Sequence, residues 1–142
     1  MITIVNENDV RGVQNINTVL ALYDVMIEQK KASKAVAEYL KPDYIQHNPI
    51  VPTGAQALGV FFNQVSAQRA ALRVVVHKII AVEDSVWAHV NFLNLFTDDP
   101  KDRGYAVVDI YRFDADGKIA EHWDVLQEIP EPQKAANSNG MF

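Results

Sequence analysis

Apolar residues in the first half of the chain recur at the spacing of α-helices. Between residues 9 and 30 they return every three or four positions, as on one face of an amphipathic helix. The pattern predicts three helices, at residues 9–30, 33–40 and 53–68, and an extended segment at 44–52 that contains two prolines. We expect Asn8 or Asp9, Ser33 and Thr53 to cap these helices, because short polar side chains accept hydrogen bonds from the first free backbone amides.

From residue 73 onward the apolar positions follow the alternation of β-strands. The pattern predicts four strands, at residues 73–82, 85–97, 104–113 and 118–127. Glu83-Asp84 and residues 115–117 have the composition of tight hairpin turns, and residues 98–103 that of a looser one. Three helices followed by an antiparallel meander predict an α+β fold, in which the sheet curls around the helices and leaves a cavity. The residues after about 130 are expected to form a loose tail.

Two of the predicted strands are apolar on both faces, at Val74–Val76 and Val107–Val108. A sheet that is covered on one face only alternates more regularly between apolar and polar residues. We therefore expect the outer face to be buried against a second copy of the chain, which predicts a homodimer. On the second predicted strand, His89 and Asn91 share one face and Asn94 has the other. The pattern leaves open which of these faces lines the cavity.

The composition excludes several classes of protein. The chain has 142 residues, 49% of them hydrophobic and 22% charged, which is typical of one globular domain over residues 1–142. A net charge of −5 and the lack of a long basic run argue against nucleic-acid binding. There is no cysteine, no signal-peptide pattern and no apolar stretch of membrane-spanning length. We therefore expect a cytoplasmic protein with no membrane partner.

Ionisable residues interrupt the apolar pattern of the last two strands. Asp109 lies between Val108 and Ile110, in a segment that should be buried, where a carboxyl group is costly unless it is hydrogen-bonded or neutral. His122 and Asp124 are two residues apart and share a strand face, which a short hairpin can turn toward Asp109. A histidine beside carboxyl groups in a cavity is typical of a proton-transfer site. A solvated pair at a strand end would have the same sequence.

Two segments carry a resemblance to a known family. Residues 44–49 read Tyr-Ile-Gln-His-Asn-Pro, and residues 109–125 contain Asp-Ile-Tyr-Arg-Phe, Gly-Lys-Ile and Glu-His-Trp-Asp-Val. In these motifs, and in the order of its elements to about Ile129, the chain resembles SnoaL-like proteins of the nuclear transport factor 2-like superfamily. The resemblance implies a cone of three N-terminal helices packed on a strongly curved, mostly antiparallel sheet. The family is named after a polyketide cyclase that closes a ring by intramolecular aldol condensation.

A second resemblance concerns the site. The motif at residues 109–119 is similar in type and spacing to one in ketosteroid isomerases, in which a protonated Asp and a Tyr of the first helix hold the enolate oxygen. The matching residues here are Asp109 and Tyr23. Those isomerases have their catalytic base, an Asp, directly before a proline, where this chain has Asn48. An amide cannot accept a proton at neutral pH, so the resemblance makes His47, one residue earlier, a candidate for the base.

Together these features predict an enzyme, with no cofactor or metal, that acts on a small apolar carbonyl compound through an enolate, by aldol-type cyclisation, isomerisation or dehydration. The predicted catalytic residues are Asp109, His47, His122 and Tyr23, with either histidine as the base. The predicted substrate-binding residues are Asn48, Asp124, Phe62, Tyr111 and Leu126. One alternative is a non-catalytic domain that binds a small ligand or another protein. Another is an epoxide hydrolase-like enzyme, although Arg112 has the wrong strand parity for the Asp–Arg–Asp arrangement of that class.

Overall fold

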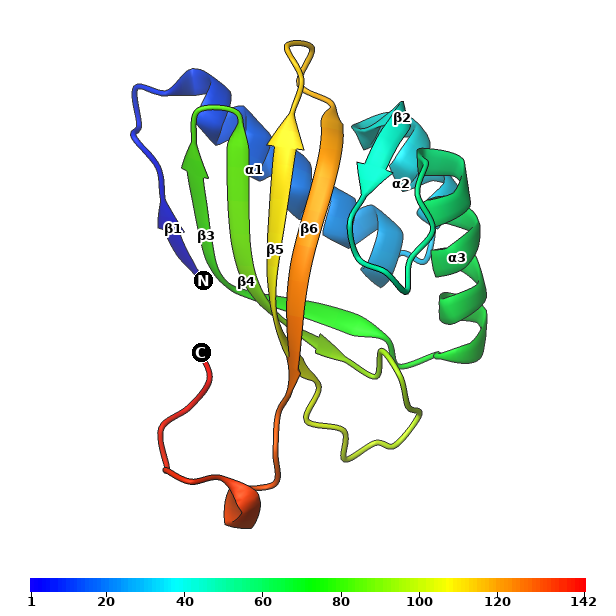
Figure 1. The fold of residues 1–142 in the computed structure, drawn as a ribbon, viewed down its shortest axis with the longest axis vertical. Helices are drawn as coiled ribbons and strands as arrows, with labels where there is room; N and C mark the ends of the chain where they lie inside the picture. Colours follow the sequence, from blue (N-terminus) through cyan, green and yellow to red (C-terminus); the bar gives the residue numbers. More distant parts are fainter.

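The computed structural model describes residues 1–142 and has the α+β architecture that the sequence pattern predicts (Figure 1). The helices are α1 (Val10–Tyr23), α2 (Ala32–Tyr39) and α3 (Ala55–Gln68), with a π-helical turn η1 (Asp24–Glu28) after α1 and a 3₁₀ turn η2 (Pro132–Lys134) near the C-terminus. The strands are β1 (Ile2–Ile4), β2 (Leu40–Gln46), β3 (Arg73–Val82), β4 (Ser85–Leu93), β5 (Tyr105–Phe113) and β6 (Ile119–Glu128). None of the helices combines the length and apolar content that a bilayer crossing requires.

The six strands form one mixed sheet in the order β1-β3-β4-β5-β6-β2. Strands β3 to β6 are antiparallel neighbours, as the meander predicts, and Glu83 in the tight turn between β3 and β4 has a φ of 56°. The edge strands β1 and β2 pair in parallel with β3 and β6. The sequence pattern did not predict β1, and it predicted part of β2 only as an extended segment. A parallel pair joins segments that are distant along the chain and have no hairpin between them, so it leaves no local signal.

The first helix begins as predicted, whereas the second does not. Asp9 caps α1, and its carboxylate accepts a hydrogen bond from the Gly12 amide at 2.9 Å. Helix α2 begins at Ala32, before the predicted cap Ser33, and its N-cap makes no side-chain hydrogen bond. The Ser33 hydroxyl instead accepts a hydrogen bond from Asn63 Nδ2 at 2.7 Å. Ser33 therefore links α2 to α3 and does not form the cap of α2 that the local pattern predicts.

The third helix follows Gly54, whose φ of 93° lies in the region that favours glycine. Thr53, the predicted cap, makes no capping bond to α3. Its hydroxyl accepts a hydrogen bond from the Gln46 amide at 3.1 Å and donates one to the Tyr44 carbonyl at 3.3 Å. Thr53 thus ties the loop before α3 to the end of β2, which carries part of the site described below.

Strand β4 ends at Leu93, four residues before its predicted end. The next residue, Asn94, has a φ of 57°, a left-handed conformation that asparagine adopts more readily than most residues. Its side-chain amide donates to the carbonyls of Thr97 and Asp99, at 3.1 and 2.8 Å. These bonds hold the chain in a loop, and the two apolar residues after Asn94 line a cavity instead of extending the strand.

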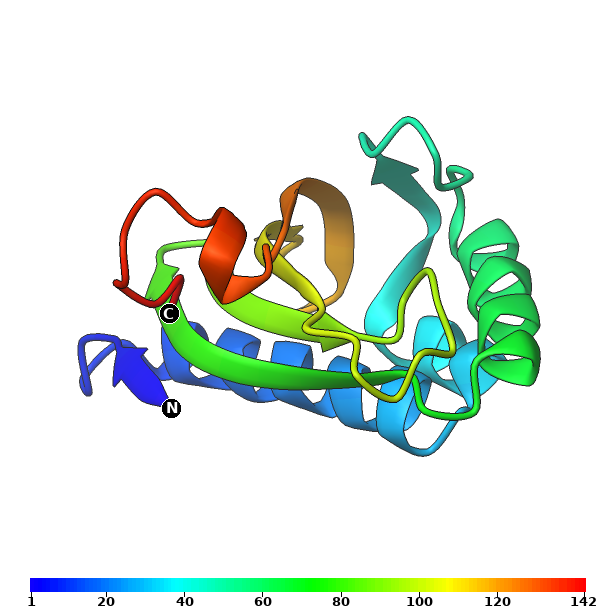
Figure 2. The same ribbon diagram turned by 90° about the horizontal axis from the view of Figure 1, so that it is seen from below.

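The core lies between the helices and one face of the sheet. Helix α1 covers that face and contacts β3 and β4, while the C-terminal segment runs along the opposite face (Figure 2). Alternate residues of β4 are buried on the helix side: Val86, Ala88, Val90 and Phe92. His89 and Asn91 have the other parity and lie on the outer face, where Phe142 packs with its ring centroid 5.1 Å from that of His89. The helix side of β4, which carries Phe92, is therefore the face that lines the cavity.

Candidate functional site

A cavity of about 80 Å³ lies between the concave face of the sheet and the helices. Most of its wall is apolar, with contributions from α1, η1, α3, four strands and the loops after β2 and β4. Apart from tyrosines, the ionisable side chains in the wall are Asp109, His122 and Asp124, and no lysine or arginine reaches it. The polar chemistry of the cavity is therefore concentrated in one cluster.

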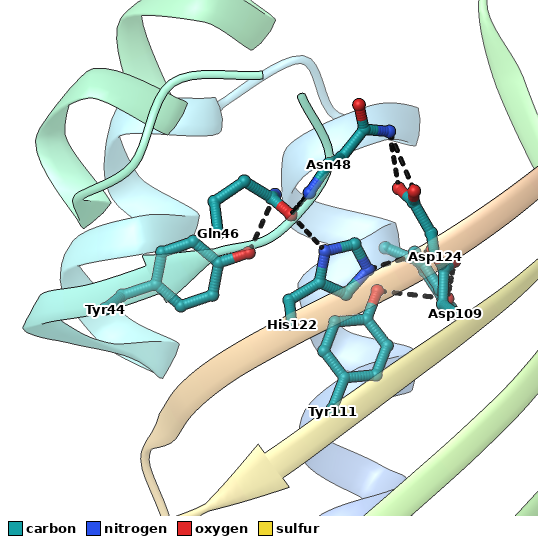
Figure 3. Close-up of polar contacts among 8 residues, drawn as sticks. Tyr44, Gln46, Asn48, Asp109, Tyr111, His122 and Asp124 are labelled. Carbon is teal, nitrogen blue, oxygen red and sulfur yellow. Dashed lines mark hydrogen bonds and ion pairs between the residues drawn. The ribbon is translucent and has the colours of Figure 1, made fainter. Parts of the chain in front are cut away.

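The antiparallel pairing of β5 and β6 assembles this cluster. Asp109 lies directly opposite Asp124, and Tyr111 lies opposite His122, so the four side chains share the inner face (Figure 3). Asp109 and His122 are almost fully buried, with 3% and 7% of their surface exposed. The predicted placement of Asp109, His122 and Asp124 on one face is confirmed.

Asp109 is held by two partners. The Tyr23 hydroxyl donates a hydrogen bond to Asp109 Oδ2 at 2.5 Å, and His122 Nε2 lies 3.0 Å from Asp109 Oδ1. Tyr111 in turn donates to the Tyr23 hydroxyl at 3.1 Å. Burial, and then the nearby Asp109, raise the pKa of Tyr23 and that of Tyr111 well above the ordinary value. Both phenols are therefore protonated at neutral pH and act as hydrogen-bond donors.

Tyr23 reaches Asp109 from the end of α1, just before the helix widens into η1. There the Gln29 amide bonds to the Asp24 carbonyl, five residues earlier, at 2.8 Å. Such π-helical turns add a residue to a helix and are frequent at functional sites. In η1 the wider turn buries three consecutive residues, Val25 to Ile27. Two of these residues, Met26 and Ile27, line the cavity beside Tyr23.

His122 is held on its other side by Gln46, which the sequence analysis did not select. His122 Nδ1 lies 3.0 Å from Gln46 Oε1, and Gln46 Nε2 donates to the Tyr44 hydroxyl at 3.0 Å. The parallel pairing of β2 with β6 brings Gln46 beside His122 in register. Only a prediction of that pairing would have identified Gln46, because nothing in the local sequence distinguishes it from a surface glutamine.

Asp124 is held by Asn48. Asn48 Nδ2 donates to both carboxylate oxygens of Asp124, at 2.7 and 2.9 Å, while Asn48 Oδ1 accepts from the Ile50 amide at 3.0 Å. Partial burial raises the pKa of Asp124, and the hydrogen bonds from Asn48 and the proximity of His122 oppose this rise. Asp124 is thus an oriented carboxylate with a higher proton affinity than an exposed aspartate.

The structure places His47 outside the cavity. Alternate residues of an extended segment point to opposite sides, so the neighbours of His47 line the cavity while His47 faces outward. Its Nε2 lies 2.8 Å from Glu121 Oε1, and its ring stacks on Trp123 with centroids 4.6 Å apart. With 40% of its side chain exposed on the far side of the strand, His47 is not in a position to serve as the predicted base.

Arg112 also lies on the outer face. Its guanidinium pairs with Glu121 Oε2 at 2.7 Å, beside His47, and does not approach Asp109. Since no arginine lines the cavity, the Asp–Arg–Asp arrangement that an epoxide hydrolase-like enzyme would need is not formed there.

The remaining predicted site residues line the cavity. These are Tyr23, Asn48, Phe62, Asp109, Tyr111, His122, Asp124 and Leu126. Beyond Gln46, the wall contains Tyr44 and three further aromatic residues that the sequence pattern did not predict as site residues, Phe61, Phe92 and Phe96. Their side chains are ordinary members of apolar patterns, so periodicity alone cannot separate them from the core.

Asp109, His122 and Asp124 are also the residues that could hold a metal ion. One ligand atom of each lies within 4.8 Å of the others. Each of these groups is already engaged: both oxygens of Asp124 accept from Asn48, and Asp109 and His122 bond to one another. A divalent cation would have to displace the bond between Asp109 and His122, so the donor set fits an ion only after rearrangement.

The chain matches known proteins in its sequence pattern and in its fold. A family model described as a SnoaL-like domain matches residues 19–122. Comparison with curated proteins gives no match. Among solved structures, a protein from Bacillus cereus named "putative polyketide cyclase" has a TM-score of 0.68 and 17% sequence identity, over 86% of this chain and 78% of its own.

Two further structures are similar to the same extent. A "putative SnoaL-like polyketide cyclase" from Jannaschia has a TM-score of 0.66 and 21% identity, over 86% of this chain and 91% of its own. A "putative isomerase of the SnoaL-like family" from Agrobacterium tumefaciens has a TM-score of 0.63 and 13% identity, over 82% of this chain and 97% of its own. At these identities the likeness concerns the fold.

Proposed function

The chain belongs to the SnoaL-like family of the nuclear transport factor 2-like superfamily, and on that premise we propose that it is an enzyme acting on a small apolar carbonyl compound. In this proposal its own side chains move the protons, and the reaction passes through an enolate or enol. Aldol-type cyclisation, isomerisation and dehydration all share that step.

The observation that supports this proposal most directly is the pair of carboxyl groups in one wall of an apolar cavity. Asp109 and Asp124 face one another across two strands but have different partners. Asp109 is buried against Tyr23 and His122, whereas Asp124 is partly buried against Asn48. Two carboxyl groups in such different surroundings are suited to opposite roles, one as acid and one as base.

Asp124 is the proposed base. Its pKa is raised by partial burial, which gives the carboxylate more affinity for a proton than an exposed aspartate has. Asn48 bonds to each oxygen once, and each oxygen keeps a further lone pair. That lone pair can take a proton from the carbon next to the substrate carbonyl. The electron pair of the broken C–H bond moves toward the carbonyl oxygen.

Tyr23, Asp109 and His122 are proposed to stabilise that oxygen. Tyr23 now donates to Asp109, and a carbonyl oxygen entering the cavity can take over this donor. The proton held between Asp109 and His122 can pass to the same oxygen, which gives a neutral enol. Collapse of the enol returns a proton to the Asp109–His122 pair, and Asp124 gives its proton back to the product, so the enzyme ends the cycle in its starting state.

The cavity favours a small and uncharged substrate. Two carboxyl groups and no lysine or arginine line it, so an anionic substrate would find repulsion and no counter-charge. Its volume of about 80 Å³ is smaller than the ~150 Å³ of an apolar cavity known to bind benzene. A compound with one ring would therefore fill it, with small movements of the wall.

Hydrogen–deuterium exchange tests this proposal without knowledge of the product. A panel of uncharged cyclic ketones and diketones would be incubated with the protein in D₂O, and loss of the proton next to the carbonyl followed by NMR. We expect exchange above background with at least one compound, and a loss of about 10²–10⁴-fold in Asp124→Asn. The matched control is Asp43→Asn, whose side chain is 78% exposed on β2, and it should exchange at the wild-type rate.

The alternative of a non-catalytic binding domain has one observation in its favour. Every polar side chain of the cluster in Figure 3 already has a partner within the chain, as in a site that binds without chemistry. The same panel separates the two functions. Compounds that raise the melting temperature but do not exchange, or exchange equally with Asp124→Asn, would favour the binding domain.

A further inference from the structure

Gln46 contacts His122, and its side chain makes no hydrogen bond to Asp109 or Asp124. It is the last residue of β2, and the parallel register sets it beside His122 on β6. Its side chain lies in the cavity wall and bonds to three groups: His122 Nδ1, the Asn48 amide and the Tyr44 hydroxyl, each at 3.0 Å. This network (Figure 3) determines where the protons of the imidazole lie.

The orientation of the Gln46 amide follows from the Asn48 backbone. A backbone N–H can only donate, and that of Asn48 points at Gln46 Oε1, so the atom there must be the oxygen. The opposite atom, Nε2, then donates to the Tyr44 hydroxyl. Because Oε1 is an acceptor, the His122 nitrogen that faces it must carry a hydrogen. His122 is therefore protonated on Nδ1.

This leaves Nε2 of His122 to face Asp109. The distance of 3.0 Å between Nε2 and Asp109 Oδ1 is that of a hydrogen bond. Without a hydrogen between them, the two atoms would face one another with lone pairs, so one proton must lie between them. The proton can sit on the carboxyl group or on the ring. In either case the Asp109–His122 pair holds one transferable proton, and the ring nitrogen on the cavity side is the one that can exchange it.

We propose that Gln46 is a positioning residue that holds His122 in its Nδ1–H form, so that Nε2 shares a proton with Asp109. As a statement about catalysis this rests on the proposed function, since it describes how the acid of that reaction is kept ready. As a statement about the imidazole it stands by itself. With Gln46 removed, no acceptor holds a hydrogen on Nδ1, so a neutral His122 can carry its single hydrogen on Nε2, as a donor to Asp109, and leave Nδ1 without one.

The test is ¹⁵N NMR of the histidine rings in uniformly labelled protein, with no substrate. Ring nitrogens with and without hydrogen have well-separated shifts, so the spectrum reports the tautomer of each histidine. In the wild type we expect His122 Nδ1 to carry a hydrogen. Gln46→Met has a similar shape but offers no oxygen, and it should move the tautomer ratio toward Nε2–H by about fivefold, the effect of one ordinary hydrogen bond. Gln46→Glu retains an oxygen and should keep Nδ1 protonated.

The outer-face residues His77 and His89 provide the control in the same spectra, because neither contacts Gln46. Their shifts should not change. An unprotonated Nδ1 on His122 in the wild type, or an unchanged His122 spectrum in Gln46→Met, would overturn the inference. If Gln46→Met does not fold, the wild-type and Gln46→Glu spectra still decide it, since both must show Nδ1–H. A failed search for a substrate leaves this result untouched, so the two proposals can fail separately.

Discussion

Replacement of Tyr23 by phenylalanine probes the cluster without changing its shape. The variant removes only the hydroxyl that donates to Asp109 Oδ2 at 2.5 Å and accepts from Tyr111 at 3.1 Å. Both bonds are buried, since Tyr23, Asp109 and Tyr111 have at most 5% of their surface exposed. The variant therefore leaves a buried acceptor on Asp109 and a buried donor on Tyr111 without the partner that they share.

The magnitude follows from these two bonds. A hydrogen bond to a charged group contributes about 1.5–3 kcal/mol, and an ordinary one about 1 kcal/mol. We therefore expect Tyr23→Phe to lower the free energy of unfolding by about 3 kcal/mol. For a domain of this size, that corresponds to a fall in melting temperature of roughly 10 °C. Tyr111→Phe removes only the weaker bond and should lower the free energy of unfolding by about 1 kcal/mol.

The double variant makes the prediction more specific. Tyr23→Phe leaves the Tyr111 hydroxyl without its acceptor, and Tyr111→Phe removes that unsatisfied hydroxyl. The double variant should therefore be less destabilised than the sum of the two single variants, by about 1 kcal/mol. Urea denaturation followed by tryptophan fluorescence or circular dichroism measures all three differences. The matched control is Tyr105→Phe, whose hydroxyl forms no hydrogen bond within the chain and whose loss should cost little.

The pH dependence gives an independent check. Because the pKa of Tyr23 is raised in the folded state, its contribution to stability is complete below about pH 10, the ordinary tyrosine value, and is lost as the pH rises above it. Tyr23→Phe lacks this group, so the gap between wild type and variant should narrow in alkali. A Tyr23→Phe variant no less stable than Tyr105→Phe, or additive effects in the double variant, would refute the reasoning.

Two further predictions concern Asp124 and the outer face of the sheet. Since the pKa of Asp124 is raised in the folded state, its contribution to stability is complete below about pH 4 and is lost as the pH rises through the folded-state pKa. In urea titrations, wild type should therefore lose stability relative to Asp124→Asn as the pH rises above about 4, and a constant difference would contradict this. On the outer face, Ile80, Trp87, Ile110 and Trp123 are neighbours in register across four strands, and Trp87 is 51% exposed. We propose that this row pairs two copies of the chain. Light scattering should then give a dimer mass for wild type and a monomer mass for Trp87→Glu, whereas a monomeric wild type would contradict the proposal.

The local pattern of residues determined most of the elements and the centre of the site. Helices α1 to α3 and strands β3 to β6 are where the periodicity predicts them, apart from their ends. Strand parity places His122 and Asp124 on one face of β6, and the hairpin to β5, together with a register shift between Arg112 and Phe113, brings that face to the side of Asp109. These features depend on residues that are close together along the chain.

The tertiary structure alone decided the second half of the site. Gln46 and His122 are 76 residues apart, and Asn48 and Asp124 are the same distance apart; both contacts follow from the parallel pairing of β2 with β6. The same pairing turned His47 outward to Glu121, against the prediction. Ser33 and Thr53 likewise bond to a neighbouring element instead of capping their helices. Such contacts depend on how whole helices and strands pack against one another. The residues next to a side chain in the sequence do not determine which distant residue it will contact.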